Sequence, residues 1–151
     1  MPTIDRTITV PGGAEEVFAY LSDFTTTEEW DPPTQTTDLV SGDGGVGTRY
    51  RNVSKFLGRE TETVYTVVTL DAPRRLELEG DASSMRLHDT ITVEQKGDDV
   101  QVSYRAEFHP EGAARLATPL LPPALKALGD AAAEQMEECL RRLPGASARA
   151  S

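Results

Sequence analysis

The sequence predicts one α+β domain, in which a long C-terminal helix lies on an antiparallel sheet of about seven strands. From about residue 36 to residue 109, strand-like segments alternate with short turn signals, which is typical of an antiparallel meander. Residues 122–143 then predict an amphipathic helix with one continuous apolar stripe. Because that stripe needs a large apolar surface to cover it, we expect the helix to lie on the apolar face of the sheet.

The start of the chain predicts one strand and two short helices. Residues 3–10 alternate between apolar and polar side chains and end at a Pro-Gly-Gly turn, which indicates the first strand. Residues 14–23 carry apolar side chains at helical spacing, with acids in the first turn where the helix dipole favours them. Two overlapping Thr-x-x-Glu stretches in residues 25–29 match the capping-box pattern. We therefore expect a second, very short helix that ends at Trp30.

The last two strands predict their own pairing. Gly97 and Asp98 are typical of a two-residue hairpin loop, and a loop at that position places His88 and Glu107 on the outer, polar face. The opposite face is apolar, and its predicted pairs are Val93 with Val102, Ile91 with Tyr104, Asp89 with Ala106 and Leu87 with Phe108.

The charge of the chain restricts its partners. The 151 residues include 25 acids and 15 basic residues, which gives a net charge of -10. Nucleic acids and anionic membrane surfaces both require clustered Lys and Arg, so we expect neither as a partner. A neutral or apolar small molecule suits the charge better. We expect the protein to be a monomer or a weak homodimer.

Several features indicate a cytoplasmic protein without a membrane anchor. Cys139 is the single cysteine and has no partner for an internal disulfide, and the first residues lack the pattern of a signal peptide. The most apolar stretch, residues 113–133, is interrupted by charges and prolines, so we expect no integral membrane association. We expect one domain at residues 1–145 and a disordered tail at residues 146–151.

Four stretches, taken with the order of elements, resemble a known family. They are FAYLSDF followed by EEWDPP, GVGTRYR at the start of a strand, LDAPRRLELEG, and HDTITVEQKGDDVQVSYRAEFHPEG before the last helix. The chain resembles the START-like superfamily, and within it the polyketide cyclase/dehydrase and lipid-transport group. The resemblance implies a helix-grip fold with an apolar ligand between the sheet and the C-terminal helix. Some members of this group are aromatases and cyclases, and many bind ligands without transforming them.

Other motifs are excluded by their context. The stretch GDGGVG at residues 42–47 matches the spacing of a dinucleotide fingerprint, but a strand follows it rather than a helix, so we interpret it as a loop. His88 and His109 are predicted to lie on the open outer face, where a metal would lack supporting hydrogen bonds. Cys139 is interpreted as a small core residue. We expect no cofactor and no metal site.

Asp89 is the most informative candidate site residue, because the strand alternation places its carboxyl on the apolar face. A carboxylate there must find hydrogen-bond donors or become protonated. One interpretation is structural, with a backbone group or a tyrosine donating to Asp89. The other is that Asp89 anchors a ligand hydroxyl or acts as a general base inside the cavity.

Aromatic and amide side chains complete the predicted ligand-binding site. In one of two plausible registers Tyr50 lies opposite Tyr65 and Asn52 opposite Thr63, and Tyr104 shares their face. Such a wall suits an aromatic, hydroxylated or sterol-like ligand, although core residues would show the same pattern. Trp30 is interpreted as an anchor of the short helix and, in a START-like fold, as a wall of the cavity. The predicted ligand-binding residues are Trp30, Tyr50, Asn52, Tyr65, Asp89 and Tyr104.

Three functions remain open at this point. The first is binding of a hydrophobic or aromatic small molecule that is lipid-like, sterol-like or polyketide-like. The second is a polyketide aromatase/cyclase or dehydratase that uses Asp89 and a cavity tyrosine as acid and base; no catalytic constellation can be identified in the sequence. The third is an interaction protein whose cavity is closed, with no void of ~300 Å3 left for a ligand.

Overall fold

The computed structural model describes residues 3–56, 58–111 and 121–146. The described residues form one antiparallel sheet of seven strands in the order β1-β7-β6-β5-β4-β3-β2, together with two short helices, a 3-10 turn and one long helix. The predicted fold class is confirmed. The elements are β1 (Thr3–Pro11), α1 (Ala14–Ser22), η1 (Phe24–Thr26), α2 (Thr27–Trp30), β2 (Thr34–Ser41), β3 (Arg49–Phe56), β4 (Arg59–Asp71), β5 (Arg75–Ala82), β6 (Met85–Lys96), β7 (Asp99–Pro110) and α3 (Leu121–Arg141).

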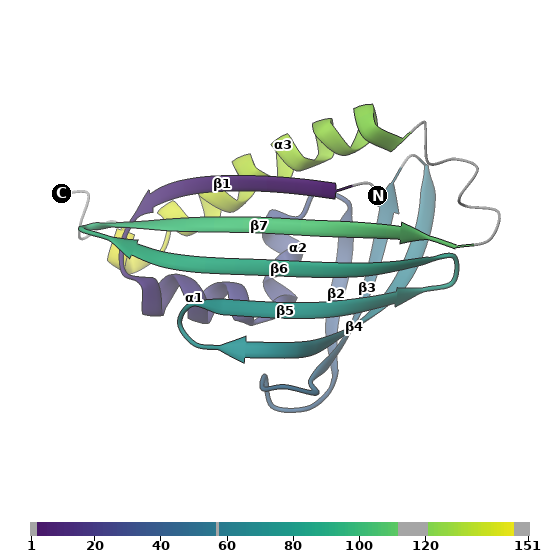
Figure 1. Cartoon of the computed structure of the whole chain (residues 1–151), viewed down its shortest axis with the longest axis horizontal. Helices are drawn as coiled ribbons and strands as arrows, with labels where there is room; N and C mark the ends of the chain where they lie inside the picture. Colours follow the sequence, from purple (N-terminus) through teal and green to yellow (C-terminus); the bar gives the residue numbers. More distant parts are fainter. Residues whose placement is uncertain (1–2, 57, 112–120, 147–151) are drawn as a thin grey trace.

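The sheet curves around the helices (Figure 1). Strands β2 to β7 follow one another as a meander, and β1 pairs with β7 at the far edge. In Figure 1, α3 runs along the β1 edge, while α1 and α2 lie behind β5, β6 and β7. The inner face of the sheet is therefore covered by three helices of very different length.

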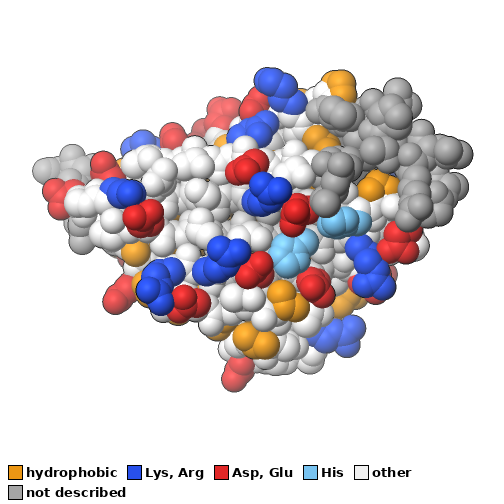
Figure 2. Space-filling view, viewed as in Figure 1, with side chains coloured by type: hydrophobic (Ala, Val, Ile, Leu, Met, Phe, Trp, Pro, Cys, Tyr) orange, Lys and Arg blue, Asp and Glu red, His pale blue; other side chains and the backbone are white. Residues whose placement is uncertain are grey.

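The predicted registers are confirmed. Asp89 lies opposite Ala106 and Ile91 opposite Tyr104 in the β6–β7 hairpin. The register that pairs Tyr50 with Tyr65 is also the one observed. Figure 2 shows the outer face of β5, β6, β7 and β1, where Lys, Arg, Asp, Glu and His side chains alternate. The alternation thus separates a polar, solvent-exposed outer face from a mainly apolar inner face.

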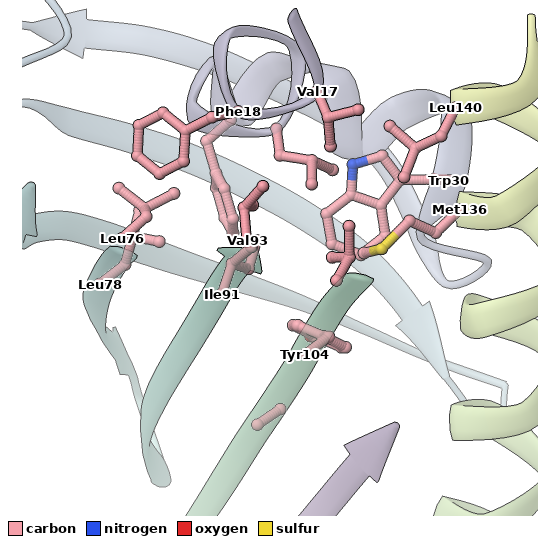
Figure 3. Close-up of a cluster of buried hydrophobic side chains, with 14 of the residues drawn as sticks. Val17, Phe18, Trp30, Leu76, Leu78, Ile91, Val93, Tyr104, Met136 and Leu140 are labelled. Carbon is pink, nitrogen blue, oxygen red and sulfur yellow. The ribbon is translucent and has the colours of Figure 1, made fainter. Parts of the chain in front are cut away.

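A dense apolar core occupies one end of the space between sheet and helices (Figure 3). Trp30, at the end of α2, is 1% exposed and lies among side chains from α1, the strands and the second half of α3. An indole at the end of a helix of four residues supplies the tertiary anchor that so short a helix needs. Besides Trp30, the labelled core residues are Val17, Phe18, Leu76, Leu78, Ile91, Val93, Tyr104, Met136 and Leu140.

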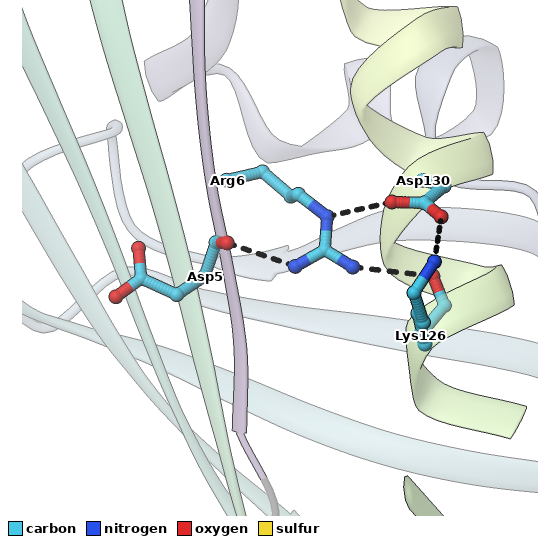
Figure 4. Close-up of polar contacts among 4 residues, drawn as sticks. All are labelled: Asp5, Arg6, Lys126 and Asp130. Carbon is cyan, nitrogen blue, oxygen red and sulfur yellow. Dashed lines mark hydrogen bonds and ion pairs between the residues drawn. The ribbon is translucent and has the colours of Figure 1, made fainter. Parts of the chain in front are cut away.

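The first half of α3 is held to β1 by a polar clasp (Figure 4). Arg6 Nε donates to Asp130 Oδ1 at 3.0 Å, and Arg6 Nη2 donates to the backbone oxygen of Lys126 at 3.2 Å. A Cβ on Gly129 would approach the Arg6 guanidinium and Ile4 Cγ2 to 3.0 Å, so a glycine lets the helix come this close. The clasp positions α3 above the inner face near β1.

Two local expectations were wrong. Thr26, the N-cap residue of α2, makes no capping hydrogen bond through its side chain, and Glu28 Oε2 instead accepts from the backbone N–H of Thr37 on β2. The glutamate therefore links α2 to the sheet rather than closing a capping box. The C-terminal helix ends at Arg141, two residues earlier than predicted, because a further turn follows it.

The predicted tail begins at Ala146, which is 2% exposed and donates its backbone N–H to the oxygen of Leu143 at 3.0 Å. Residues 147–151 of that tail lie outside the described residues. Among the helices that the structure describes, none is long and apolar enough to span a membrane.

Candidate functional site

A cavity of about 420 Å3 lies between the inner face of the sheet and the first half of α3. The strands contribute most of its wall, and α3 contributes Leu128 and Ala132. Leu128 and Ala132 of α3 thus line the cavity, whereas Met136 and Leu140, further along the helix, pack in the dense core. The polar side chains on the wall are Asp31, Ser54, Arg59, Thr61, Thr63, Tyr65, Ser84, Asp89 and Tyr104.

Asp89 lies on this wall in the middle of β6 and is 3% exposed. Its Oδ2 accepts a hydrogen bond from the Tyr104 hydroxyl at 3.4 Å, which is a long contact. Its Oδ1 is buried and has no hydrogen-bond partner among the described residues. Burial, together with the nearby Asp31 carboxylate, raises the pKa of Asp89 to about 8, although the Tyr104 hydroxyl opposes the shift. Asp89 is therefore a largely protonated acid at neutral pH.

Asp31 is a second carboxyl on the same wall, and sequence reasoning did not select it. It is the first residue after α2, and its Oδ2 accepts from the Thr34 hydroxyl at 2.6 Å. Burial raises the pKa of Asp31 to about 6. The sequence signal was present, because Asp31 precedes Pro32 and cannot continue the helix that anchors Trp30.

Tyr65 and Tyr104 supply the aromatic part of the wall. Burial raises the pKa of both hydroxyls well above the usual value, and the Asp89 carboxylate adds to the shift. Both hydroxyls therefore stay protonated and are able to donate. The Tyr65 ring packs edge-on against Phe24 at a centroid distance of 5.0 Å, so it is fixed from behind.

The three other predicted ligand-binding residues lie off the wall. Trp30 contacts the cavity only through Tyr104, whose ring meets the indole edge-on at a centroid distance of 5.4 Å. Tyr50 lies beside Phe24, with ring centroids 5.8 Å apart, and borders a separate surface hollow near α1 and η1. The structure thus brings Tyr65, Asp89 and Tyr104 together and places Trp30 and Tyr50 behind them.

Asn52 belongs to a buried polar cluster that ties α2 to β2 and β3. Its Nδ2 donates to the hydroxyls of Thr34 and Thr37, both at 2.9 Å. The Thr37 hydroxyl also lies 2.6 Å from the Thr27 hydroxyl at the start of α2. These bonds leave the Asn52 donors satisfied by protein groups, which is the arrangement of a structural residue.

Gly80 on β5 also shapes the wall and was not identified from the sequence as a site residue. A Cβ at this position would lie 2.8 Å from Cε1 of Tyr65 and 3.0 Å from Cγ2 of Thr63. Tyr65 is therefore held between the bare backbone of Gly80 and the Phe24 ring. A glycine is required here by contact rather than by its backbone angles.

The described side chains outside the cavity offer no competing chemical site. No group of three His, Cys, Asp or Glu side chains in residues 3–56, 58–111 and 121–146 is arranged to hold a metal. His88 Nε2 lies 2.9 Å from Glu77 Oε1 on the outer face, beside surface charges. Cys139 is buried, and its Sγ donates to the backbone oxygen of Glu29 at 3.6 Å.

A larger hollow of about 660 Å3 lies at the other end of the sheet. It is lined by residues of β6 and β7 and by the β4–β5 turn at Ala72, Pro73 and Arg74. The smaller cavity is the stronger candidate, because it holds the buried carboxyl group whose hydrogen bonding is incomplete.

The fold is shared with solved structures of low sequence identity. A protein from Thermus thermophilus is 16% identical and matches with a TM-score of 0.77 over 91% of this chain and 95% of its own. A START superfamily protein from Mycobacterium smegmatis is 15% identical, with a TM-score of 0.70 over 91% of this chain and 98% of its own. An aromatase/cyclase from a Streptomyces species is 16% identical, with a TM-score of 0.72 over 93% and 94% of the two chains.

Sequence comparison identifies the family directly. No curated protein matches the chain. The model of one family, described as polyketide cyclase / dehydrase and lipid transport, matches residues 1–143. That match covers the sheet, the short helices and all of α3. The chain therefore belongs to the polyketide cyclase/dehydrase and lipid transport family, with the START-like helix-grip fold that the sequence predicted.

Proposed function

We propose that the protein binds a hydrophobic or aromatic small molecule in the cavity between the sheet and α3. The observation that carries this proposal is that a cavity of about 420 Å3 contains Asp89, a buried carboxyl with one oxygen unpartnered among the described residues. A buried polar atom without a partner is costly, and a ligand that supplies the missing hydrogen bond removes the cost. The apolar wall would hold the body of the ligand and Asp89 its polar group.

The volume of the cavity supports binding over the closed-cavity alternative. Ligand pockets begin at ~300 Å3, and this cavity of about 420 Å3 exceeds that limit. Its apolar side chains come from β1, β5, β6, β7 and α3 and from Pro33, so a ligand there would contact both the sheet and the C-terminal helix. They are Ile4, Pro33, Ala82, Met85, Leu87, Ala106, Phe108, Leu128 and Ala132.

An enzymatic role is the second candidate, and the acid at Asp89 favours it. A carboxyl with a pKa of about 8 exchanges protons near neutral pH, which suits a general acid or base in cyclisation or dehydration. Tyr104 Oη lies 3.4 Å from Asp89 Oδ2 and would be its partner. Conversion of a polyketide-like substrate is best followed as loss of water by mass spectrometry. If the substrate binds but is not converted, only the ligand-binding function remains supported.

We also propose which partners the protein avoids, where it is located and its oligomeric state. The net charge of -10 supports a role away from nucleic acids and anionic membranes. We expect a cytoplasmic monomer or weak homodimer whose ligand-binding domain spans residues 1–145.

Native mass spectrometry of the purified protein, with organic extraction of any bound molecule, tests the proposed function. NMR titration with fatty acids, sterols and polyaromatic phenols should follow. We expect shifted amide signals on α3 and on β4, β6 and β7 together, since all four elements line the cavity. Binding in the cavity would be contradicted if none of the tested ligands shifts amide signals on both α3 and the strands.

A further inference from the structure

We propose that the polar group recognised by the cavity is a cation, and that the ligand class is an aromatic or otherwise apolar amine whose ammonium group binds Asp89 and Asp31. This inference rests on the proposed function and specifies its ligand. It starts from two carboxyl groups on one cavity wall, one of which has a buried and unpartnered oxygen.

The two carboxyl groups, Asp31 and Asp89, have no ion-pair partner in the part of the chain that the structure describes. The negative charge of Asp31 is one of the causes that keep Asp89 protonated. Two acids that repel each other on one cavity wall are stabilised by a positive charge placed near both. An ammonium group supplies that charge together with up to three N–H donors.

The aromatic wall suits the same group. Tyr65 and Tyr104 both line the cavity, and Trp30 supports Tyr104 from behind. Aromatic faces attract cations, and the attraction grows when water is excluded. A neutral alcohol would satisfy Asp89 Oδ1 but would lack the charge-dependent attraction that an ammonium group has to the second carboxyl and to the rings.

The charged groups that face Asp89 from the surrounding elements are few. Asp31 follows α2, the two tyrosines come from β4 and β7, and α3 and β1 contribute only apolar side chains to the wall. Arg59 is the cation on the wall, and it lies beside the β3–β4 turn, whereas Asp89 lies in the middle of β6. A metal ion is a poorer occupant, because no third His, Cys, Asp or Glu of the described residues completes a ligand set.

Amine binding has a proton balance that can be measured. The Asp89 carboxyl is mostly protonated at pH 7, since its pKa is about 8. When a protonated amine binds, that carboxyl releases its proton to solvent, and the resulting carboxylate accepts N–H hydrogen bonds. No covalent bond to carbon forms or breaks. We expect release of up to one proton per amine bound and affinity that rises from pH 6 to pH 8.

Calorimetry with three probes of one shape tests the inference: 2-naphthylmethylamine, 2-naphthylmethanol and 2-naphthoate. At pH 8 we expect the amine to bind roughly tenfold more tightly than the alcohol, and the acid to bind most weakly. Proton release follows from repeating the amine titration in buffers of different ionisation enthalpy. Asp89→Asn and Asp31→Asn should each remove most of the preference for the amine. Asp38→Asn removes the same charge from an exposed position on β2 and should leave the preference intact.

The outcomes separate the two proposals. The proposal of a cationic ligand is wrong if the wild type binds amine and alcohol equally, or if the preference for the amine survives both cavity substitutions. Either result leaves the proposed binding function intact. Failure of all three probes to bind counts against both. Thermal unfolding of each variant excludes misfolding as the cause, and because Asp31 and Asp89 lie on different elements, either variant alone keeps the test decisive.

Discussion

Asp89 is a carboxyl group that the fold buries without fully satisfying it. It lies opposite Ala106 in the β6–β7 hairpin, on the face that the alternation of the strand turns inward. Tyr104 contacts Oδ2, and Oδ1 has no partner in the described residues. A residue needed only for structure would be better served by an apolar side chain of similar size, so the arrangement favours a role in binding.

The stability of the protein should depend on pH through Asp89. Its folded pKa of about 8 lies above the ordinary value of 3.8, so the folded state binds the proton more tightly than the unfolded state. The stabilisation is complete below about pH 4 and is lost as the pH rises toward 8, by at most ~1.4 kcal/mol per pH unit. We expect the wild-type Tm to fall between pH 5 and pH 8, and the Tm of Asp89→Asn to fall less.

Asp31 contributes in the same direction, but only up to its pKa of about 6. Because Asp31 is present in both proteins, its contribution cancels, and the slopes of the two Tm curves should differ over the whole range from about pH 4 to pH 8. Parallel Tm curves across that range would contradict a raised pKa at Asp89.

At the scale of elements, α3 and the strands divide the interior into a core and a cavity. The meander of β2 to β7, the β6–β7 register and the long helix could be predicted, because alternation and turn residues act locally. The pairing of β1 with β7 joins distant parts of the chain and was not predicted. Which inward-facing side chains meet the cavity could not. Tyr50 and Tyr65 share a face and a register, yet only Tyr65 lines the cavity, since η1 packs Phe24 between the two rings. Which of the two tyrosines lines the cavity depends on where the helices pack, and the alternation of side chains along the strands does not determine that.

Gly80→Ala should weaken ligand binding. The new methyl group would lie 2.8 Å from the Tyr65 ring, which Phe24 prevents from moving away, so the ring must shift along the cavity wall. Overpacking of this kind costs about 1–3 kcal/mol of stability. We expect a loss of affinity of several-fold, measured by calorimetry. Gly45→Ala, in the β2–β3 loop and without a positive φ, is the matched control and should bind as the wild type does.

Thr37→Val should separate folding from binding. It removes hydrogen bonds from Asn52 and Thr27 in the buried cluster that ties α2 to the sheet. Loss of buried hydrogen bonds should lower the free energy of unfolding by about 1–3 kcal/mol, measured by urea denaturation. Affinity for the cavity ligand should stay within twofold. A loss of affinity without a loss of stability would instead support the prediction from the sequence that Asn52 contributes to ligand binding.

At the scale of the molecule, the charged outer face and the dry inner face have different roles. The outer face carries alternating charges and makes the exposed ion pairs, which contribute little to stability. The inner face carries the core at one end and the cavity at the other. We expect this cavity, rather than a surface hollow, to hold the ligand.

A substitution that fills the cavity from the helix side tests whether the ligand binds there. Ala132 is 1% exposed and lines the cavity from α3, so Ala132→Leu would occupy ligand volume, whereas Ala127→Leu adds the same atoms to an exposed position of α3. The measurement is the calorimetric Kd of 2-naphthylmethanol for the wild type and both variants, each checked for folding by its Tm. We predict at least roughly tenfold weaker binding to Ala132→Leu and unchanged binding to Ala127→Leu. Equal affinity in all three folded proteins would contradict a ligand in this cavity.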